Sequence, residues 1–149
     1  MKEITKNKKA FFDYTILEKF EAGIVLEGSE VKSIRNNQVN LKNSFCKIIN
    51  SEIFVFDMHI SKYSQQNSFK LLSETRARKL LLKKKEILKL YKKVNEEGLS
   101  IVPLRIYFND KNKCKIEIAL VKGKKLYDKR ETLKKKTQDM DIKRSLKDY

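Results

Sequence analysis

The sequence contains few of the residues from which catalytic and metal sites are built. Among its 149 residues are one histidine (His59), two cysteines (Cys46 and Cys114) and no tryptophan. A structural zinc site takes about four Cys or His ligands, so these three cannot form one alone. The phosphate-binding GxxxxGK loop and the dinucleotide-binding GxGxxG turn are both absent. His59 lies in an apolar, alternating segment, where a structural role is favoured, and no nucleophile has a base beside it. We therefore expect no catalytic residue, no metal and no cofactor.

Long apolar runs are missing as well. No run of 18 or more apolar residues occurs, which argues against a membrane-spanning helix. The first residues carry charges and lack the apolar stretch of a secretory signal. We therefore expect a cytoplasmic location, no membrane partner, and both cysteines reduced in the core or at an interface.

Acidic residues are outnumbered by basic ones. Lys and Arg total 35 against 19 Asp and Glu, which gives a formal net charge of +16. Apolar residues still make up 40% of the chain, enough for a hydrophobic core, so we expect one folded domain. The excess positive charge favours a polyanionic partner such as a nucleic acid.

Glycine and proline are scarce, at four and one, so element boundaries are predicted from periodicity. Alternation and β-branched or aromatic residues predict five strands. These are 11–26 with a bulge at Gly23, 45–49, 53–60, 101–108 and 114–121. Short turns pair the second strand with the third and the fourth with the fifth, which predicts two hairpins. Pro103 indicates an edge strand or the start of a strand.

Two helices are predicted between these strands. A short one covers Glu30–Arg35 with Ser29 as its N-cap. A longer amphipathic one runs from Ser73 to Val94 and is capped by Gly98. Antiparallel hairpins interrupted by one long helix favour a mainly β (α+β) fold, an OB-like antiparallel barrel with flanking helices.

The composition changes after Val121. Residues 122–149 hold 11 Lys and Arg against five Asp and Glu, with few aliphatic side chains. Such a segment cannot bury enough surface to offset its ordering entropy. We expect a barrel over residues 1–127 and a basic C-terminal tail over 128–149 that is disordered until it binds a partner.

Two basic clusters and one acid are candidate RNA contacts. Arg76, Arg78 and Lys79 lie around the start of the predicted long helix, where positive charge opposes the helix dipole unless an anion binds there. Neutralisation by Glu74 and solvent is the alternative. The run KGKK (122–125) could hold phosphates or be a solvated linker. Glu30 could accept hydrogen bonds from bases or be an acid favoured by the helix dipole.

Six stretches, in this order, closely resemble the SsrA-binding proteins, the small protein B family of bacterial trans-translation. They are EAGIVLEGSEVKSIR (21–35), NLKNSFCKI (40–48), MHIS (58–61), RKLLLKKKEI (78–87), GLSIVPLRIYF (98–108) and KGKKLYDKRE (122–131). The resemblance runs from about Asn7 to Glu131, and the ordered set, more than any single motif, carries it.

The resemblance implies an OB-fold barrel that binds the tRNA-like domain of transfer-messenger RNA (tmRNA, or SsrA RNA) in place of a missing anticodon arm. Such a complex enters a ribosome stalled on a message without a stop codon and rescues it. The implied ribosomal partners are the small-subunit decoding centre and the mRNA channel. Elongation factor Tu (EF-Tu) and alanyl-tRNA synthetase are implied as indirect partners through tmRNA. We expect a monomer.

The expected RNA contacts combine the basic cluster at the start of the predicted long helix with the residues that match the family's motifs. They are Glu30, Lys32, Arg35, Arg76, Arg78, Lys79, Lys122, Lys124 and Lys125. The resemblance also implies residues that contact the ribosome, at the start of a tail that becomes helical in the mRNA channel. They are Asp128, Lys129, Arg130 and Glu131, and Phe12 on the barrel is a further expected contact with the ribosome.

One position departs from the family. Relatives commonly have Arg-His-Asp-Tyr where this chain has Phe11, Phe12, Asp13 and Tyr14, and that histidine is thought to stack in the decoding centre. Phe12 keeps a ring that can stack but cannot donate a hydrogen bond. We expect most of the neighbouring aromatic residues to be buried, with Phe12 as the exception.

Other functions remain open from the residues alone. A structural ribosomal protein, or a general RNA-binding protein, would also be small and basic with a tail that threads RNA. A ribosomal protein would stay with washed subunits, whereas a rescue factor would not. An RNA-processing enzyme is disfavoured by the lack of a nucleophile, a base and a metal site.

Overall fold

A computed structural model describes residues 1–62 and 73–124. Within them three helices accompany the strands, and they are α1 (Lys8–Asp13), α2 (Gly28–Arg35) and α3 (Lys84–Glu97). The strands are β1 (Lys2–Lys6), β2 (Tyr14–Ile24), β3 (Val39–Asn40), β4 (Phe45–Ile49), β5 (Glu52–Phe56), β6 (His59–Ile60), β7 (Arg78–Leu81), β8 (Ser100–Phe108) and β9 (Cys114–Gly123).

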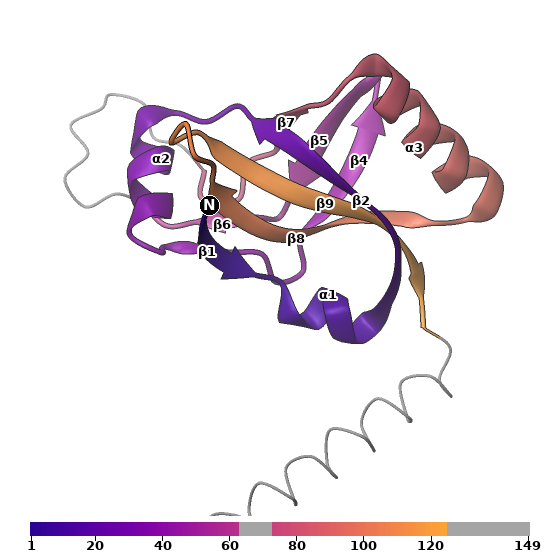
Figure 1. Cartoon of the computed structure of the whole chain (residues 1–149), viewed down its shortest axis with the longest axis horizontal. Coiled ribbons are helices and arrows are strands. Elements are labelled where there is room, and N and C mark those ends of the chain that lie inside the picture. Colours follow the sequence, from indigo (N-terminus) through magenta and orange to yellow (C-terminus); the bar gives the residue numbers. More distant parts are fainter. Residues whose placement is uncertain (63–72, 125–149) are drawn as a thin grey trace, which may run out of the picture.

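The strands form a nearly closed antiparallel barrel. Going round it, β8 is followed by β4, β5, β7, β2 and β9, and β9 pairs again with β8 (Figure 1). β1 adds to the outer part of β8, and β3 pairs with β6 in a small separate sheet. The mainly β, OB-like barrel with flanking helices that the sequence predicts is confirmed.

Strand β9 shows why this sequence closes a barrel. Ile116, Ile118 and Leu120 alternate along it and are buried in the main core. Ala119 and Val121, which point to the other face of the strand, are also buried, in a second apolar cluster beneath α1. Each fully buried aliphatic side chain contributes about 1.5–3 kcal/mol to folding. Helix α1 thus covers a face of the barrel that would otherwise expose an apolar strand.

The predicted helix over 73–94 is wrong at its start. Residues 78–81 form β7, which fills the place between β5 and β2, and the helix begins only at Lys84. In β7, Arg78 and Leu80 are buried while Lys79 and Leu81 are exposed, so the alternation is that of a strand. A run of leucines satisfies both periodicities over four residues, and the need to close the sheet decides between them.

The N-terminal segment also differs from the prediction. Residues 11–13 belong to α1, whose N-cap Asn7 accepts a hydrogen bond from the Ala10 amide at 3.1 Å. The register shift in β2 lies between Ile16 and Glu18, not at Gly23. Strand β1, which the sequence analysis did not predict, pairs with β8.

Two further strand predictions need correction. The predicted strand 53–60 is divided at Asp57, whose φ of 58° turns the chain so that β6 leaves the barrel sheet. Pro103 lies inside β8, a strand with neighbours on both sides, and not at an edge. It is tolerated there because Pro103 has a ladder partner on one side only, Ile118 of β9. On the other side β8 pairs with β4 at Ile101 and with β1 from Arg105 onward, so no ladder partner is placed opposite Pro103 there.

The end of α3 gives a first testable prediction. Gly98 caps the helix with a left-handed φ of 64°, and no atom lies within 4 Å of where a Cβ would be. Gly98→Ala should therefore lower the free energy of unfolding by about 1 kcal/mol through backbone strain alone. Urea unfolding measures this. Gly28→Ala, at an equally open position without a positive φ, is the matched control and should show no such loss; equal losses would contradict the prediction.

Candidate RNA-binding site

Helix α2 begins two residues earlier than predicted, and its N-cap is Glu27 instead of Ser29. The Glu27 amide donates a hydrogen bond to Oε1 of Glu30 at 3.0 Å. The Glu30 side chain therefore folds back over the first turn of the helix. This places a carboxylate at the positive end of the helix dipole, where it is stabilised.

Two arginines from a distant segment meet this carboxylate. Arg76 donates from Nε to Oε2 at 3.2 Å and from Nη2 to Oε1, and Arg78 donates from Nε to Oε2 at 2.6 Å. Glu30 is only 5% exposed. We call Glu30, Arg76 and Arg78 the α2 ion cluster. It fastens α2 to the start of β7.

Arg78 uses its remaining donors inside the protein. Nη1 donates to the Met58 carbonyl at 2.6 Å and Nη2 to the Glu74 carbonyl at 3.1 Å. The side chain is fully buried, with 0% exposed. A direct contact between Arg78 and an RNA phosphate, as the sequence analysis expected, does not fit this geometry. Its position instead assigns Arg78 to holding Glu30 and the neighbouring backbone.

The cluster fixes the protonation of its acid. Burial alone would raise the pKa of Glu30, but hydrogen bonds from Arg76, the Glu27 amide and Arg78 outweigh it and hold the pKa below its ordinary value of 4.5. Burial also lowers the pKa of Arg78, an effect that Glu30 opposes. The pair therefore remains charged at neutral pH.

Acid should weaken this cluster. Since the pKa of Glu30 is lower in the folded state, the unfolded state binds more protons as the pH falls. The stabilisation is complete above about pH 4.5 and is lost as the pH falls through the folded-state pKa. Urea unfolding from about pH 7 to about pH 3 measures it. Glu30→Gln, which cannot titrate there, should lose less stability over that interval than the parent chain; parallel curves would count against this assignment.

Glu74 links the same region to His59. The His59 Nε2 and Glu74 Oε2 atoms lie 2.6 Å apart, and this hydrogen bond lowers the pKa of Glu74. The Glu74 carbonyl also accepts from the Ile60 amide at 2.9 Å. His59 therefore has the structural role that its position in an apolar strand favoured.

Three other cations that were predicted to contact RNA lie near the α2 ion cluster, but their side chains point in different directions. Lys32 and Arg35 are exposed on α2. The Arg35 guanidinium lies 4.2 Å from the centre of the Phe108 ring and donates to Oδ1 of Asn112 at 3.1 Å. Lys79 points away from the barrel interior and pairs with Glu52 at 2.5 Å.

Comparisons with known proteins agree along the whole chain. The profile of the family described as "SmpB protein" matches residues 4–148. The chain belongs to the SmpB family. An SsrA-binding protein of Helicobacter hepaticus is 58% identical over 98% of this chain and 94% of its own, and one of Nitratiruptor sp. is 56% identical over 100% and 99%. A solved structure described as "tmRNA-SmpB: a journey to the center of the bacterial ribosome" matches with a TM-score of 0.68 and 40% identity, over 87% of this chain and 93% of that one.

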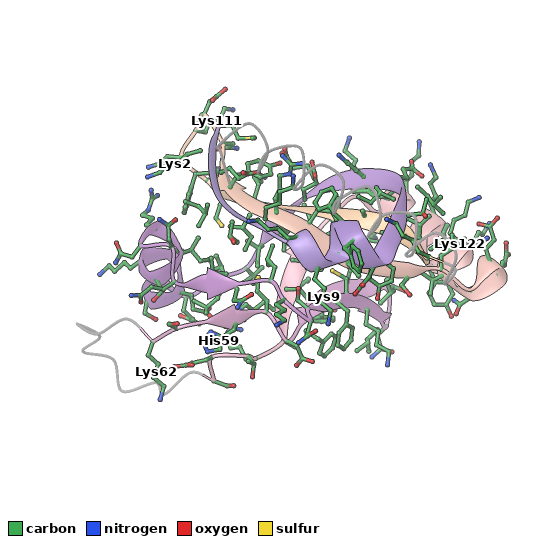
Figure 2. The ribbon with its side chains drawn as sticks, turned by 90° about the horizontal axis from the view of Figure 1, so that it is seen from below. Lys2, Lys9, His59, Lys62, Lys111 and Lys122 are labelled. Atoms are coloured by element: carbon green, nitrogen blue, oxygen red, sulfur yellow. The ribbon has the colours of Figure 1, made fainter. Side chains whose placement is uncertain are left out.

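The other described residues that were predicted as contacts of this SmpB family member lie elsewhere on the barrel. Lys122 lies near the end of β9 and Lys124 directly after it. In Figure 2, Lys122 lies at the opposite end of the view from Lys62, the last described residue before position 73. The Lys124 Nζ atom lies 6.0 Å from the centre of the Phe12 ring. Phe12 is half-buried, as are Phe11 and Tyr14, so it is not the exception that was expected. Lys125, Asp128, Lys129, Arg130 and Glu131 lie outside the described residues.

All three members of the α2 ion cluster are predicted as site residues from the sequence, but their pairing is not. Arg76 and Arg78 have i, i+2 spacing, which places both on one face of a strand, whereas the sequence analysis placed them around a helix start. Within residues 1–62 and 73–124, no three His, Cys, Asp or Glu side chains lie together as metal ligands would. Nor is any helix of these ranges long and apolar enough to cross a membrane.

Proposed function

We propose that this SmpB family member binds the tRNA-like domain of tmRNA (SsrA RNA) and acts without bond chemistry in trans-translation. The observation that carries the proposal is the match, at 40% identity over most of both chains, to SmpB in a structure described with tmRNA and the bacterial ribosome. Relatives that match the full length of this chain are called SsrA-binding proteins. Both point to the same RNA.

The geometry suggests how α2 takes part. Lys32 and Arg35 are exposed on α2, and Arg76 is partly exposed beside them. Exposed cations can contact phosphates, while Glu30 and Arg78, being buried, act by fixing α2 in place. We therefore assign RNA contacts at this end to Lys32, Arg35 and Arg76. Lys79, exposed on β7, is a further candidate.

We assign the opposite end of the barrel, where β9 ends, to contacts with a further part of the RNA backbone and with the ribosome. Lys122 and Lys124 stand where the chain leaves β9, and Phe12 lies beside Lys124. From there residues 125–149 would lead to the decoding centre and mRNA channel of the small subunit. Asp128, Lys129, Arg130 and Glu131 would begin that contact. EF-Tu and alanyl-tRNA synthetase would meet the monomeric protein only through the RNA.

The proposal is tested by binding at several salt concentrations. The tRNA-like domain of tmRNA should bind more tightly than a tRNA transcript of similar length, with log K falling by about 0.7–0.9 per phosphate contact for each unit of log salt. Lys32→Gln should reduce that slope by about one contact. Lys92→Gln on α3, which removes the same charge from another exposed site, should not. No preference for the tRNA-like domain would overturn the proposal.

A further inference from the structure

The barrel has a partly open side between β4 and β8. These strands pair at a single register, Cys46 with Ile101, and then separate. Two cavities of about 310 and 370 Å³ are lined by residues of both strands, and a third of about 640 Å³ lies between the turn that follows β4 and helix α3. The first two share Tyr14, Phe45 and Val102, and the last two share Ile48 and Tyr91, so the three cavities lie next to one another. We call the three together the β4–β8 groove.

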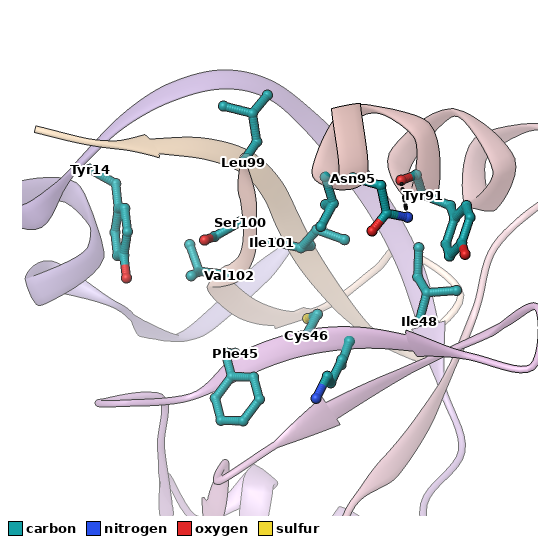
Figure 3. A pocket seen from close by; sticks show the side chains of 12 residues that line it. Tyr14, Phe45, Cys46, Ile48, Tyr91, Asn95, Leu99, Ser100, Ile101 and Val102 are labelled. Atoms are coloured by element: carbon teal, nitrogen blue, oxygen red, sulfur yellow. Dashed lines mark hydrogen bonds between the residues drawn. The ribbon is translucent and has the colours of Figure 1, made fainter. Parts of the chain in front are cut away.

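Aromatic rings are exposed along this groove. Tyr91 from α3 is 52% exposed and Phe45 from β4 is 40% exposed. Phe45 stacks on Phe56 with ring centres 5.4 Å apart and an interplanar angle of 13°, so its ring is held in a fixed orientation. Figure 3 shows Tyr14 and Tyr91 toward opposite ends of the central cavity, with Phe45 below. The rings of Tyr91 and Phe45 are therefore accessible to a ligand.

The charge of the groove is positive. Lys47 lines the central cavity and Lys84 the largest one, and neither cavity has an acidic side chain in its lining. In the part of the chain that the structure describes, neither lysine has an ion-pair partner, whereas nearby Lys89 is paired with Glu18 at 2.7 Å. Only the smallest cavity adds an acid, Asp13.

We propose that the β4–β8 groove binds single-stranded RNA, with unpaired bases stacked on Tyr91 and Phe45 and phosphates held by Lys47 and Lys84. Exposed aromatic rings along a basic groove are how proteins hold unpaired strands without reading sequence. Bases inside an RNA duplex cannot reach such rings. A peptide strand added to β4 would not need the two unpaired lysines. The groove adds a second RNA surface to the proposed function but does not depend on α2, which lies at the other end of the barrel (Figure 1).

The test uses the full chain and a labelled, unstructured RNA oligonucleotide of about ten nucleotides. Tyr91→Ala should weaken its binding about tenfold, the loss expected for one stacked base, and Tyr91→Phe should keep it. Leu81→Ala removes an equally exposed apolar side chain on β7 and should change nothing. Lys47→Glu should weaken binding more than Lys19→Glu, which makes the same charge change on the exposed side of β2.

Each outcome decides for or against the groove. Unchanged affinity in Tyr91→Ala, or equal losses in Lys47→Glu and Lys19→Glu, would overturn the inference. So would photo-cross-links from a thiouridine-substituted oligonucleotide that fall only in residues 122–149. Failure of the parent chain to bind the tRNA-like domain would overturn the proposed function and leave the groove standing. The thermal unfolding of every variant is measured as well, so that a loss of binding is distinguished from a loss of folding. Lys47→Glu helps in this, because it changes an exposed side chain.

Discussion

Glu30→Ala is expected to lower the free energy of unfolding by about 3–5 kcal/mol, which is a large part of the stability of a small domain. The substitution leaves the Arg78 guanidinium fully buried without its carboxylate partner. It also removes the acceptor of the Glu27 amide and of Arg76. An uncompensated buried charge costs far more than a lost surface contact.

Urea unfolding near neutral pH measures the effect. Glu18→Ala is the matched control, since Glu18 pairs with Lys89 at the surface with both side chains at least 39% exposed, and its loss should stay below about 1 kcal/mol. Adding Arg78→Met to Glu30→Ala removes the stranded charge and should restore part of the stability. Equal losses in Glu30→Ala and Glu18→Ala would show that the α2 ion cluster does not hold the fold.

The Glu30→Gln variant separates two roles of Glu30. If Glu30 acts only by fixing α2 and Arg76, Glu30→Gln should lower the RNA affinity of the folded fraction only through the displacement of α2. Adding Lys32→Gln should then lower the affinity by less than the sum of the two single losses. Contacts in one network are not additive, whereas separate contacts are. Additive losses of RNA affinity in the double variant would instead indicate that Glu30 contacts a base directly, as the sequence suggested.

The sequence predicts the barrel well because its strongest signals are local. The hairpins predicted over 45–49 with 53–60 and over 101–108 with 114–121 follow from alternation and short turns, and β4 with β5 and β8 with β9 form them, with β5 ending at Phe56. Gly98 is identified as a helix cap by residue type alone. What could not be predicted depends on partners far away in the chain. Strand β7 exists because β5 and β2 need a strand between them.

The functional residues divide in the same way. Lys32 and Arg35 are found from the motif and lie on the surface as expected. The burial of Arg78 could not be foreseen, because it depends on Glu30 and the Met58 carbonyl, 48 and 20 residues away. Net charge counts cations but does not say which of them are occupied by internal acceptors.

A chain that ends at Asp128 is expected to bind the tRNA-like domain with nearly the affinity of the full chain and to lose the tagging of proteins made from messages without a stop codon. The removed residues carry eight of the 35 basic side chains and none of the cations assigned to α2. Since affinity follows the number of phosphates contacted, most of it should remain. Tagging should fall to background, because the removed segment is the part assigned to the mRNA channel.

Both quantities are measured on the same preparations, RNA binding by titration and tagging in a reconstituted translation reaction with a stop-less message. Reversal of the tail charges at Lys134, Lys135 and Lys136 to glutamate, with the length kept, is the matched control for charge. If the barrel and the tail act separately, it should reduce tagging and spare the binding of the tRNA-like domain. A truncated chain that loses RNA affinity in proportion to tagging would show that the tail belongs to the RNA-binding surface, and the division of labour between the two ends of the barrel would have to be abandoned.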